Sequence, residues 1–196
     1  MTHIEDIPHI VQNGITHRES ERSNKHYKTI GDNSLINTRD HFTISSGDTL
    51  GDFIPFYFGQ RTPMLYVIQN GYNGVEAVHS CEIVYCVSSV QKVLEAGIDF
   101  IYTDGHATDR FTKFYSSVNL NDISNQVDFE ATKAKFWKDE NDLDLKRRKE
   151  AEFLIRQDLK YSYISGFIVY NDKAKNQLIA LGIDPEKLVA RPASYF

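Results

Sequence analysis

Apolar and β-branched residues recur along the chain in short runs separated by polar turns, a pattern that predicts alternating strands and helices. Runs typical of strands or extended segments occupy residues 53–58, 63–68, 82–87, 99–103, 150–155, 166–171 and 187–192. Helical spacing, in several cases with a capping residue or a terminal glycine, predicts helices at residues 4–14, 88–97, 107–116, 128–138 and 172–182. Because these elements interleave without a regular βαβ rhythm, the predicted fold class is α+β.

Residues 15–50 are polar and show little periodicity. So long an irregular stretch is uncommon inside a compact domain, and such stretches are usually functional or mobile. The length of 196 residues nevertheless suits one domain over residues 1–196.

Glu152 stands where an apolar strand enters the predicted core. Period-2 alternation places Ala151 and Phe153 on one face of that strand and Glu152 on the other. A glutamate is almost never fully buried without a partner. Glu152 is therefore either a solvated charge beside the basic run 146–149 or a carboxylate kept in the core for its chemistry.

The charge balance narrows the possible partners. With 22 basic and 27 acidic residues the formal net charge is −5, so contact with nucleic acid requires a local basic patch. No apolar run approaches the roughly 18 residues of a membrane span, and no secretory signal pattern opens the chain. Cys81 and Cys86 point to opposite faces of one predicted strand, so a disulfide between them is not expected. We expect a cytoplasmic protein.

Familiar nucleotide-binding, zinc-binding and hydrolase motifs are absent from the sequence. Two unusual segments remain as candidates for a functional site. The sequence "DGH" at residues 104–106 directly follows a predicted strand, where functional loops often lie, but an ordinary turn fits equally well. The segment "DFIPFYFGQRTPMLY" at residues 52–66 gathers aromatic residues around Arg61. It is either plain core or a platform on which nucleobases stack.

The motifs "IPFYFGQRTPMLY", "FIYTDGHAT" and "KRRKEAEFLI", in this order and at these spacings, resemble the DarT family of bacterial toxins. The opening "MTHIEDIPHIVQNGI" and the segment "IGDNSLINTRD" are also similar to that family, so the resemblance covers nearly the whole chain. It implies an ADP-ribosyltransferase-like fold with two small packed β-sheets and flanking helices. The implied activity is transfer of ADP-ribose from NAD⁺ to thymine or guanine in single-stranded DNA, with release of nicotinamide.

The resemblance also assigns roles to individual residues. Glu152 corresponds to the catalytic glutamate that faces the NAD⁺ ribose, and Arg39 to an arginine that contacts the NAD⁺ phosphates and the incoming base. Thr2, His3 and Gly14 match the NAD⁺-binding opening of the family. The residues expected to contact DNA are Tyr57, Arg61, Met64, His106, Lys146, Arg147 and Arg148.

The family further implies a bacterial toxin that uses no metal and is paired with a macrodomain antitoxin that removes ADP-ribose. We expect the protein to be a monomer. Two other functions stay open. A metal-dependent nuclease would use Asp104, Glu152 and a nearby lysine, although Glu-x-Lys is missing from the strand. A non-catalytic module would bind single-stranded DNA through the aromatic segment alone. Magnesium dependence separates the nuclease from the transferase, and NAD⁺ binding separates the transferase from the module.

Overall fold

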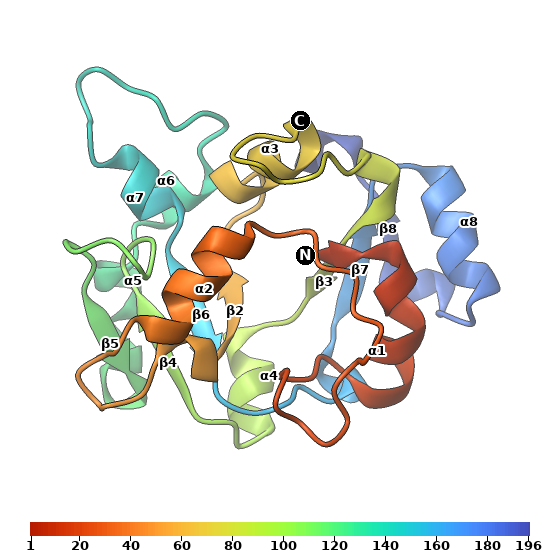
Figure 1. Cartoon of the computed structure of the whole chain (residues 1–196), viewed down its shortest axis with the longest axis horizontal. Coiled ribbons are helices and arrows are strands. Elements are labelled where there is room, and N and C mark those ends of the chain that lie inside the picture. Colours follow the sequence, from red (N-terminus) through yellow and green to blue (C-terminus); the bar gives the residue numbers. More distant parts are fainter. The chain divides into compact units, whose positions relative to one another are not determined.

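A computed structural model describes all 196 residues and confirms the α+β class (Figure 1). The chain forms two compact units, each built around one four-stranded sheet. Unit 1 comprises Met1–Asp32, Val67–Ile98 and Gln157–Phe196, and unit 2 comprises Asn33–Tyr66 and Asp99–Arg156. None of the helices combines the length and apolar character that crossing a membrane requires.

The sheet of unit 1 has the order β1-β3-β7-β8. Its strands are β1 (Thr2–His3), β3 (Ile83–Val87), β7 (Gly166–Val169) and β8 (Leu188–Ala190). β3 pairs antiparallel with β1 and β7, whereas β7 and β8 are parallel. Parallel neighbours need a crossover connection, and α8 (Asp172–Ala180) supplies it.

The predicted helix boundaries of unit 1 are largely confirmed. α1 (Ile7–Asn13) follows Asp6, has its proline in the first turn and ends at Gly14. α4 (Val90–Glu95) is capped by the Ser89 hydroxyl, which accepts a hydrogen bond from the Lys92 backbone N–H. The Ser89 cap satisfies a backbone N–H that has no partner inside the helix, whereas the side chain of Asp6, the expected N-cap of α1, makes no capping hydrogen bond.

The sheet of unit 2 has the order β2-β6-β4-β5 and is antiparallel throughout. Its strands are β2 (Ile54–Tyr57), β6 (Glu152–Ile155), β4 (Phe100–Thr103) and β5 (Phe114–Ser116). β6 lies between β2 and β4, and all four of its residues are buried. Phe153 stacks on Phe100 on one face, and Leu154 joins a cluster with Leu50 on the other. Glu152, two residues before Leu154, shares that second face.

Three predictions of secondary structure are wrong. Residues 63–68 belong to a helix, α3 (Pro63–Asn70), in which the Leu65 N–H donates to the Thr62 hydroxyl. Residues 107–116 form turns and β5 rather than a helix, and the helix expected at 128–138 is only α6 (Phe129–Lys133). A short apolar run suits a strand and a buried helix turn alike, so its partners in the fold decide which forms.

Three further helices lie in unit 2. They are α2 (Asn33–His41), α5 (Ile123–Gln126) and α7 (Leu145–Lys149). α2 lies within the stretch that lacked a periodic signal, and none of its residues is buried. Phe42, directly after α2, packs on the Leu50 cluster and so anchors the helix to the unit. Without an apolar face of its own, α2 leaves no pattern for sequence analysis to find.

Lys149 ends α7 with a side chain that has no exposure to solvent. Its ammonium group donates to the backbone carbonyls of Thr132, Ala134 and Gln60, at 3.3, 2.5 and 3.4 Å. An ammonium group has three donors, so these carbonyls use all of them. Lys149 therefore links α6 to the turn after β2, and it fixes the chain immediately before Glu152.

Candidate active site

The Glu152 carboxylate is buried at the start of the central strand, with 1% of the side chain exposed. Its Oε1 accepts a hydrogen bond from the Ala107 backbone N–H at 2.8 Å, and its Oε2 accepts one from Arg39 Nη1 at 2.9 Å. Each oxygen keeps further lone-pair capacity. Glu152 is therefore a held carboxylate rather than a solvated surface charge.

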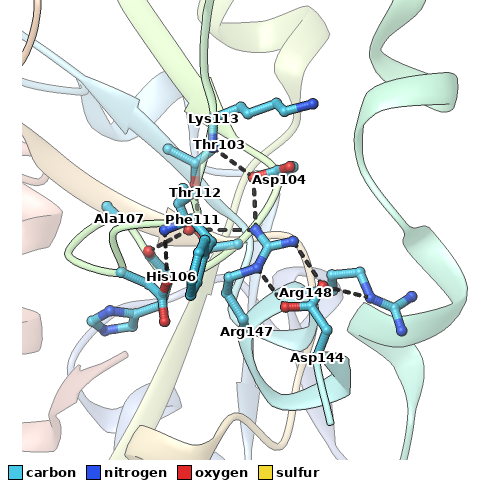
Figure 2. Close-up of polar contacts among 12 residues, drawn as sticks. Thr103, Asp104, His106, Ala107, Phe111, Thr112, Lys113, Asp144, Arg147 and Arg148 are labelled. Atoms are coloured by element: carbon cyan, nitrogen blue, oxygen red, sulfur yellow. Dashed lines mark hydrogen bonds and ion pairs between the residues drawn. The ribbon is translucent and has the colours of Figure 1, made fainter. Parts of the chain in front are cut away.

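The loop after β4 holds the donor that faces Glu152. The Thr103 hydroxyl accepts from the Glu152 backbone N–H at 3.0 Å and donates to the Gly105 carbonyl at 2.6 Å. A Cβ on Gly105 would lie 2.4 Å from Nη1 and 2.7 Å from Cγ of Arg147, so a larger residue here would displace the Arg147 side chain. The loop from Thr103 to Thr112 thus winds around the Arg147 guanidinium, as Figure 2 shows. It presents the Ala107 N–H as a fixed dipole.

Arg39 reaches Glu152 from the last turn of α2, and 14% of its side chain is exposed. Only Nη1 is used by the carboxylate. Nη2 is buried and has no hydrogen-bond partner. A buried donor without an acceptor costs free energy, about 1–3 kcal/mol for a neutral group and more for a charged one. The guanidinium is therefore poised to bind a further acceptor, such as a phosphate or ribose oxygen.

Two other predicted site residues are close enough to influence this pair electrostatically. Tyr57 lies directly across from Glu152 in the β2–β6 register, so both side chains project from the same face. Burial, and then the carboxylates of Glu152 and Glu150, raise the pKa of Tyr57 well above its usual value. Burial also lowers the pKa of His106, although Glu152 opposes that shift. At neutral pH the site thus holds an uncharged phenol and an uncharged imidazole.

The basic run has more internal ion pairs than expected. Arg147 binds Asp144 and Asp104 at 2.7 and 2.8 Å (Figure 2). Arg148 pairs with Asp128, Asp142 and Asp144. Both guanidinium groups therefore hold the loops around α7 together. Lys146 is exposed and makes no ion pair or hydrogen bond through its ammonium group. The predicted contact of these residues with DNA stays a prediction, and Lys146 is the one whose ammonium group forms no ion pair within the protein.

The aromatic segment is divided between β2 and α3. Arg61 follows β2 with a φ of 54°, in the left-handed region that a non-glycine residue rarely adopts. Met64 lies in the first turn of α3 and is half-buried. Phe58 packs edge-on against Phe153 and Phe129, so part of the segment is core. Backbone strain of this kind persists only where the surroundings enforce it, and it is frequent at binding sites.

The three residues expected to open the NAD⁺ site lie in unit 1. Thr2 and His3 form β1 and are buried, and the Thr2 hydroxyl donates to Asp6 at 2.8 Å. Gly14 has a φ of 82°, and a Cβ there would lie 2.2 Å from the Leu159 carbonyl oxygen. Gly14 therefore has a structural reason to be glycine. The role of these residues toward NAD⁺ stays a prediction.

No group of three or more His, Cys, Asp and Glu side chains is placed to hold a metal ion. Asp104, which the nuclease hypothesis requires, has its carboxylate bonded to Arg147 and to the Lys113 backbone N–H. Both cysteines are free thiols, as expected.

Sequence reasoning missed three groups around Glu152. They are the Ala107 N–H, the Thr103 hydroxyl and the buried carboxyl group of Glu150. Only Glu150 left a detectable signal, because its position two residues before Glu152 in a strand-like run suggests a shared face. A backbone N–H leaves no mark in the residue pattern.

Known proteins resemble this chain over its full length. The family model described as ssDNA thymidine ADP-ribosyltransferase, DarT, matches residues 1–196. A DNA ADP-ribosyl transferase of Escherichia coli O127:H6 is 33% identical over 181 residues, which are 91% of this chain and 82% of that protein. A fusion protein of Thermosipho africanus, DNA ADP-ribosyl transferase with DNA ADP-ribosyl glycohydrolase, is 27% identical over 91% of this chain and 43% of its own length.

Solved structures agree with these matches. Thermus sp. 2.9 DarT in complex with ADP-ribosylated ssDNA has a TM-score of 0.86 and 26% identity, covering 100% of this chain and 93% of that chain. The same protein in complex with NAD⁺ has a TM-score of 0.81 and 26% identity, covering 100% and 94%. The matches confirm the predicted ADP-ribosyltransferase fold and the enzyme class. Because the family model spans every residue, this chain belongs to the DarT family of single-stranded-DNA ADP-ribosyltransferases.

Proposed function

We propose that this protein transfers ADP-ribose from NAD⁺ to a nucleobase in single-stranded DNA and releases nicotinamide. Thymine is the acceptor that the description of the family model favours, and guanine is the alternative. The observation that carries the proposal is the buried pair of Glu152 and Arg39, in which one guanidinium nitrogen still lacks an acceptor.

Glu152 has the role that this reaction requires. When the bond between nicotinamide and ribose breaks, positive charge develops on C1′ and the ring oxygen of the ribose. A fixed carboxylate that binds the ribose hydroxyls stabilises this charge, and burial strengthens the interaction. Nicotinamide leaves as a neutral group without a general acid, so this site has no need of the two carboxylates that glycosidases use.

Arg39 has the geometry to bind NAD⁺ beside Glu152. Its planar guanidinium places two donors side by side, and Glu152 uses only one. In the proposal the second donor binds a phosphate oxygen or the incoming base. Thr2, His3 and Gly14 are proposed as further NAD⁺ contacts, and both units are proposed to act as one ADP-ribosyltransferase domain.

On the DNA side we assign the base contacts to Tyr57, Arg61, Met64 and His106. Lys146 is the proposed contact to the phosphodiester backbone, because its ammonium group has no partner within the protein. Arg147 and Arg148 could add to that contact only in competition with their aspartates.

We further propose that the protein is the toxin of a toxin–antitoxin pair in a bacterium. The Thermosipho relative, which joins a DNA ADP-ribosyl transferase to a DNA ADP-ribosyl glycohydrolase, supports an antitoxin that removes ADP-ribose. Expression should stop growth of a host cell, and coexpression of such a glycohydrolase should restore it. Undiminished growth without the glycohydrolase would contradict this role.

The decisive experiment for the activity is incubation of the purified protein with NAD⁺ and oligonucleotides that each contain one kind of reactive base. Intact mass should show the gain of one ADP-ribose on the thymine oligonucleotide, in chelator as well as in magnesium. Gain on the guanine oligonucleotide instead would change the base and leave the reaction class unchanged. Strand cleavage that depends on magnesium would favour the nuclease, and binding without any mass gain would favour the non-catalytic module.

We expect single-stranded DNA to be modified faster than the same sequence in a duplex. The reactive edge of a paired base is occupied, and extruding a base from the stack costs a few kcal/mol. Initial rates with one oligonucleotide, alone and annealed to its complement, measure the difference. Equal rates would mean that the site does not require an exposed base.

A further inference from the structure

Glu150 is a buried acid that has no role in the reaction as described above. The residue is 7% exposed, and its carboxyl group makes no hydrogen bond and no ion pair in the structure. Both carboxyl oxygens of Glu150 keep some contact with solvent. A buried carboxylate of this kind costs free energy unless another group binds it. Near a catalytic centre, such a cost usually reflects a function.

The position of Glu150 ties it to the active site. It caps the C-terminus of α7, where a negative charge is disfavoured by the helix dipole, and it precedes Glu152 by two residues. The charged or titratable groups that act on it are Lys146 and Lys149 from α7, Glu152 from β6 and Tyr57 from β2. Glu150 therefore interacts electrostatically with Glu152 and with Tyr57 and Lys146, two residues assigned to the DNA side. These residues form a cluster around Glu150.

The transfer reaction leaves one proton unassigned. The acceptor nitrogen of thymine or guanine carries a hydrogen that must leave when that nitrogen bonds to C1′. Arg39 is a poor acceptor for it, because a guanidinium has only donors and a pKa above about 12. Tyr57 is a neutral phenol, and Glu152 is already bonded to two donors. Glu150 is the carboxyl group in this cluster that has no donor.

We propose that Glu150 is the general base that accepts the proton from the acceptor nitrogen of the nucleobase, an inference that rests on the proposed function. The nitrogen–hydrogen bond breaks and its proton passes to the Glu150 carboxylate. The freed electron pair forms the bond from nitrogen to C1′. The electron pair of the bond between C1′ and nicotinamide leaves with nicotinamide and neutralises its ring. Glu150 then releases the proton to water.

The pKa of Glu150 suits this role. Burial first, and then the Glu152 carboxylate, raise the pKa of Glu150 from its usual value to about 7, although Lys146 and Lys149 oppose that shift. A general base works best when its pKa lies near the working pH. Because only the carboxylate accepts a proton, the transfer rate should rise with pH up to about 7 and then level off.

The test is Glu150→Gln, assayed with NAD⁺ and a single-stranded oligonucleotide that the wild type modifies. Transfer at pH 8 should fall by at least about 100-fold, within the usual range for loss of a general base. Its rate should no longer level off near pH 7 but continue to rise with hydroxide. Nicotinamide release without DNA should stay within about threefold, because Glu152 still acts on the ribose. Glu130→Gln, which neutralises an exposed acid of α6, is the matched control.

Three outcomes would overturn the inference. The first is transfer by the Gln variant near the wild-type rate. The second is an equal loss of transfer and of nicotinamide release without DNA, which would place Glu150 on the NAD⁺ side. The third is a transfer rate of the Gln variant that still levels off, but below pH 6.5. Because the pKa of His106 is lowered, such a profile would identify the imidazole as the base. If the wild type modified no oligonucleotide, the proposed function would fail together with the inference, whereas the three outcomes above leave it intact.

The pH dependence of thermal stability tests whether the Gln variant is folded. The folded-state pKa of Glu150 lies above its unfolded value of 4.5, so its contribution to stability is present at pH 4 and is lost as pH rises through about 7. Glu150→Gln should remove that dependence and melt no lower than the wild type at pH 8. Should it fail to fold, Glu150→Asp retains a carboxylate and should keep the levelling of the rate at lower overall activity. Loss of the levelling in Glu150→Asp would count against the proposal.

Discussion

Replacing Glu152 by Gln should reduce ADP-ribosyl transfer by about 10²–10³-fold or more, the usual effect of removing one fixed electrostatic group from an active site. The substitution keeps the size of the side chain and removes its charge. An amide can still accept from the Ala107 N–H, but its NH₂ group then faces the Arg39 guanidinium, which is itself a donor. The loss should appear in transfer and in nicotinamide release alike, because Glu152 acts on the ribose.

The measurement is single-turnover transfer to the modified oligonucleotide, with NAD⁺ binding determined separately. Glu152→Asp is the informative companion, since it keeps the charge and withdraws the carboxylate by one methylene. It should also lose most of the activity. In cells, the Gln variant should be tolerated where the wild type stops growth. A purified Gln variant with a rate near wild type would show that the Glu152 charge has no catalytic role.

Replacing Arg39 by Lys should lower transfer by at least about tenfold, equivalent to roughly 1.4 kcal/mol. The ammonium group can keep the ion pair with Glu152, so the buried carboxylate is not left without a cation. It cannot also supply the second donor that Nη2 provides at a fixed distance within the same plane. The defect should therefore appear in catalysis and in NAD⁺ affinity rather than in stability.

Arg22→Lys, at an arginine whose side chain is 60% exposed, controls for the exchange itself and should have wild-type activity. Thermal unfolding of both variants should lie close to that of the wild type. A fully active Arg39→Lys variant would mean that Nη2 binds no substrate group. A variant that unfolded instead would assign Arg39 a mainly structural role.

Local patterns in the sequence determined most elements of the fold. Short apolar and β-branched runs identified β2, β3, β4, β6, β7 and β8, and helical spacing with a capping serine or a terminal glycine identified α1, α4 and α8. These signals are strong because each depends on neighbours within a few residues, as in the hydrogen bond from the Lys92 N–H to Ser89. The same local patterns did not predict the helices α3 and α2. The run from Pro63 suits helix and strand equally, and α2 has no buried face.

The sequence also marked Glu152 as unusual and, through its resemblance to a family, paired it with Arg39. Only the tertiary structure could decide that Glu152 is buried and that Arg39, 113 residues away, is its partner. The same holds for the Ala107 N–H and for the Glu150 carboxyl group without a partner. Whether an acid is solvated or held depends on what other segments place around it. That environment arises from contacts between residues far apart in the chain, and a sequence pattern records only near neighbours.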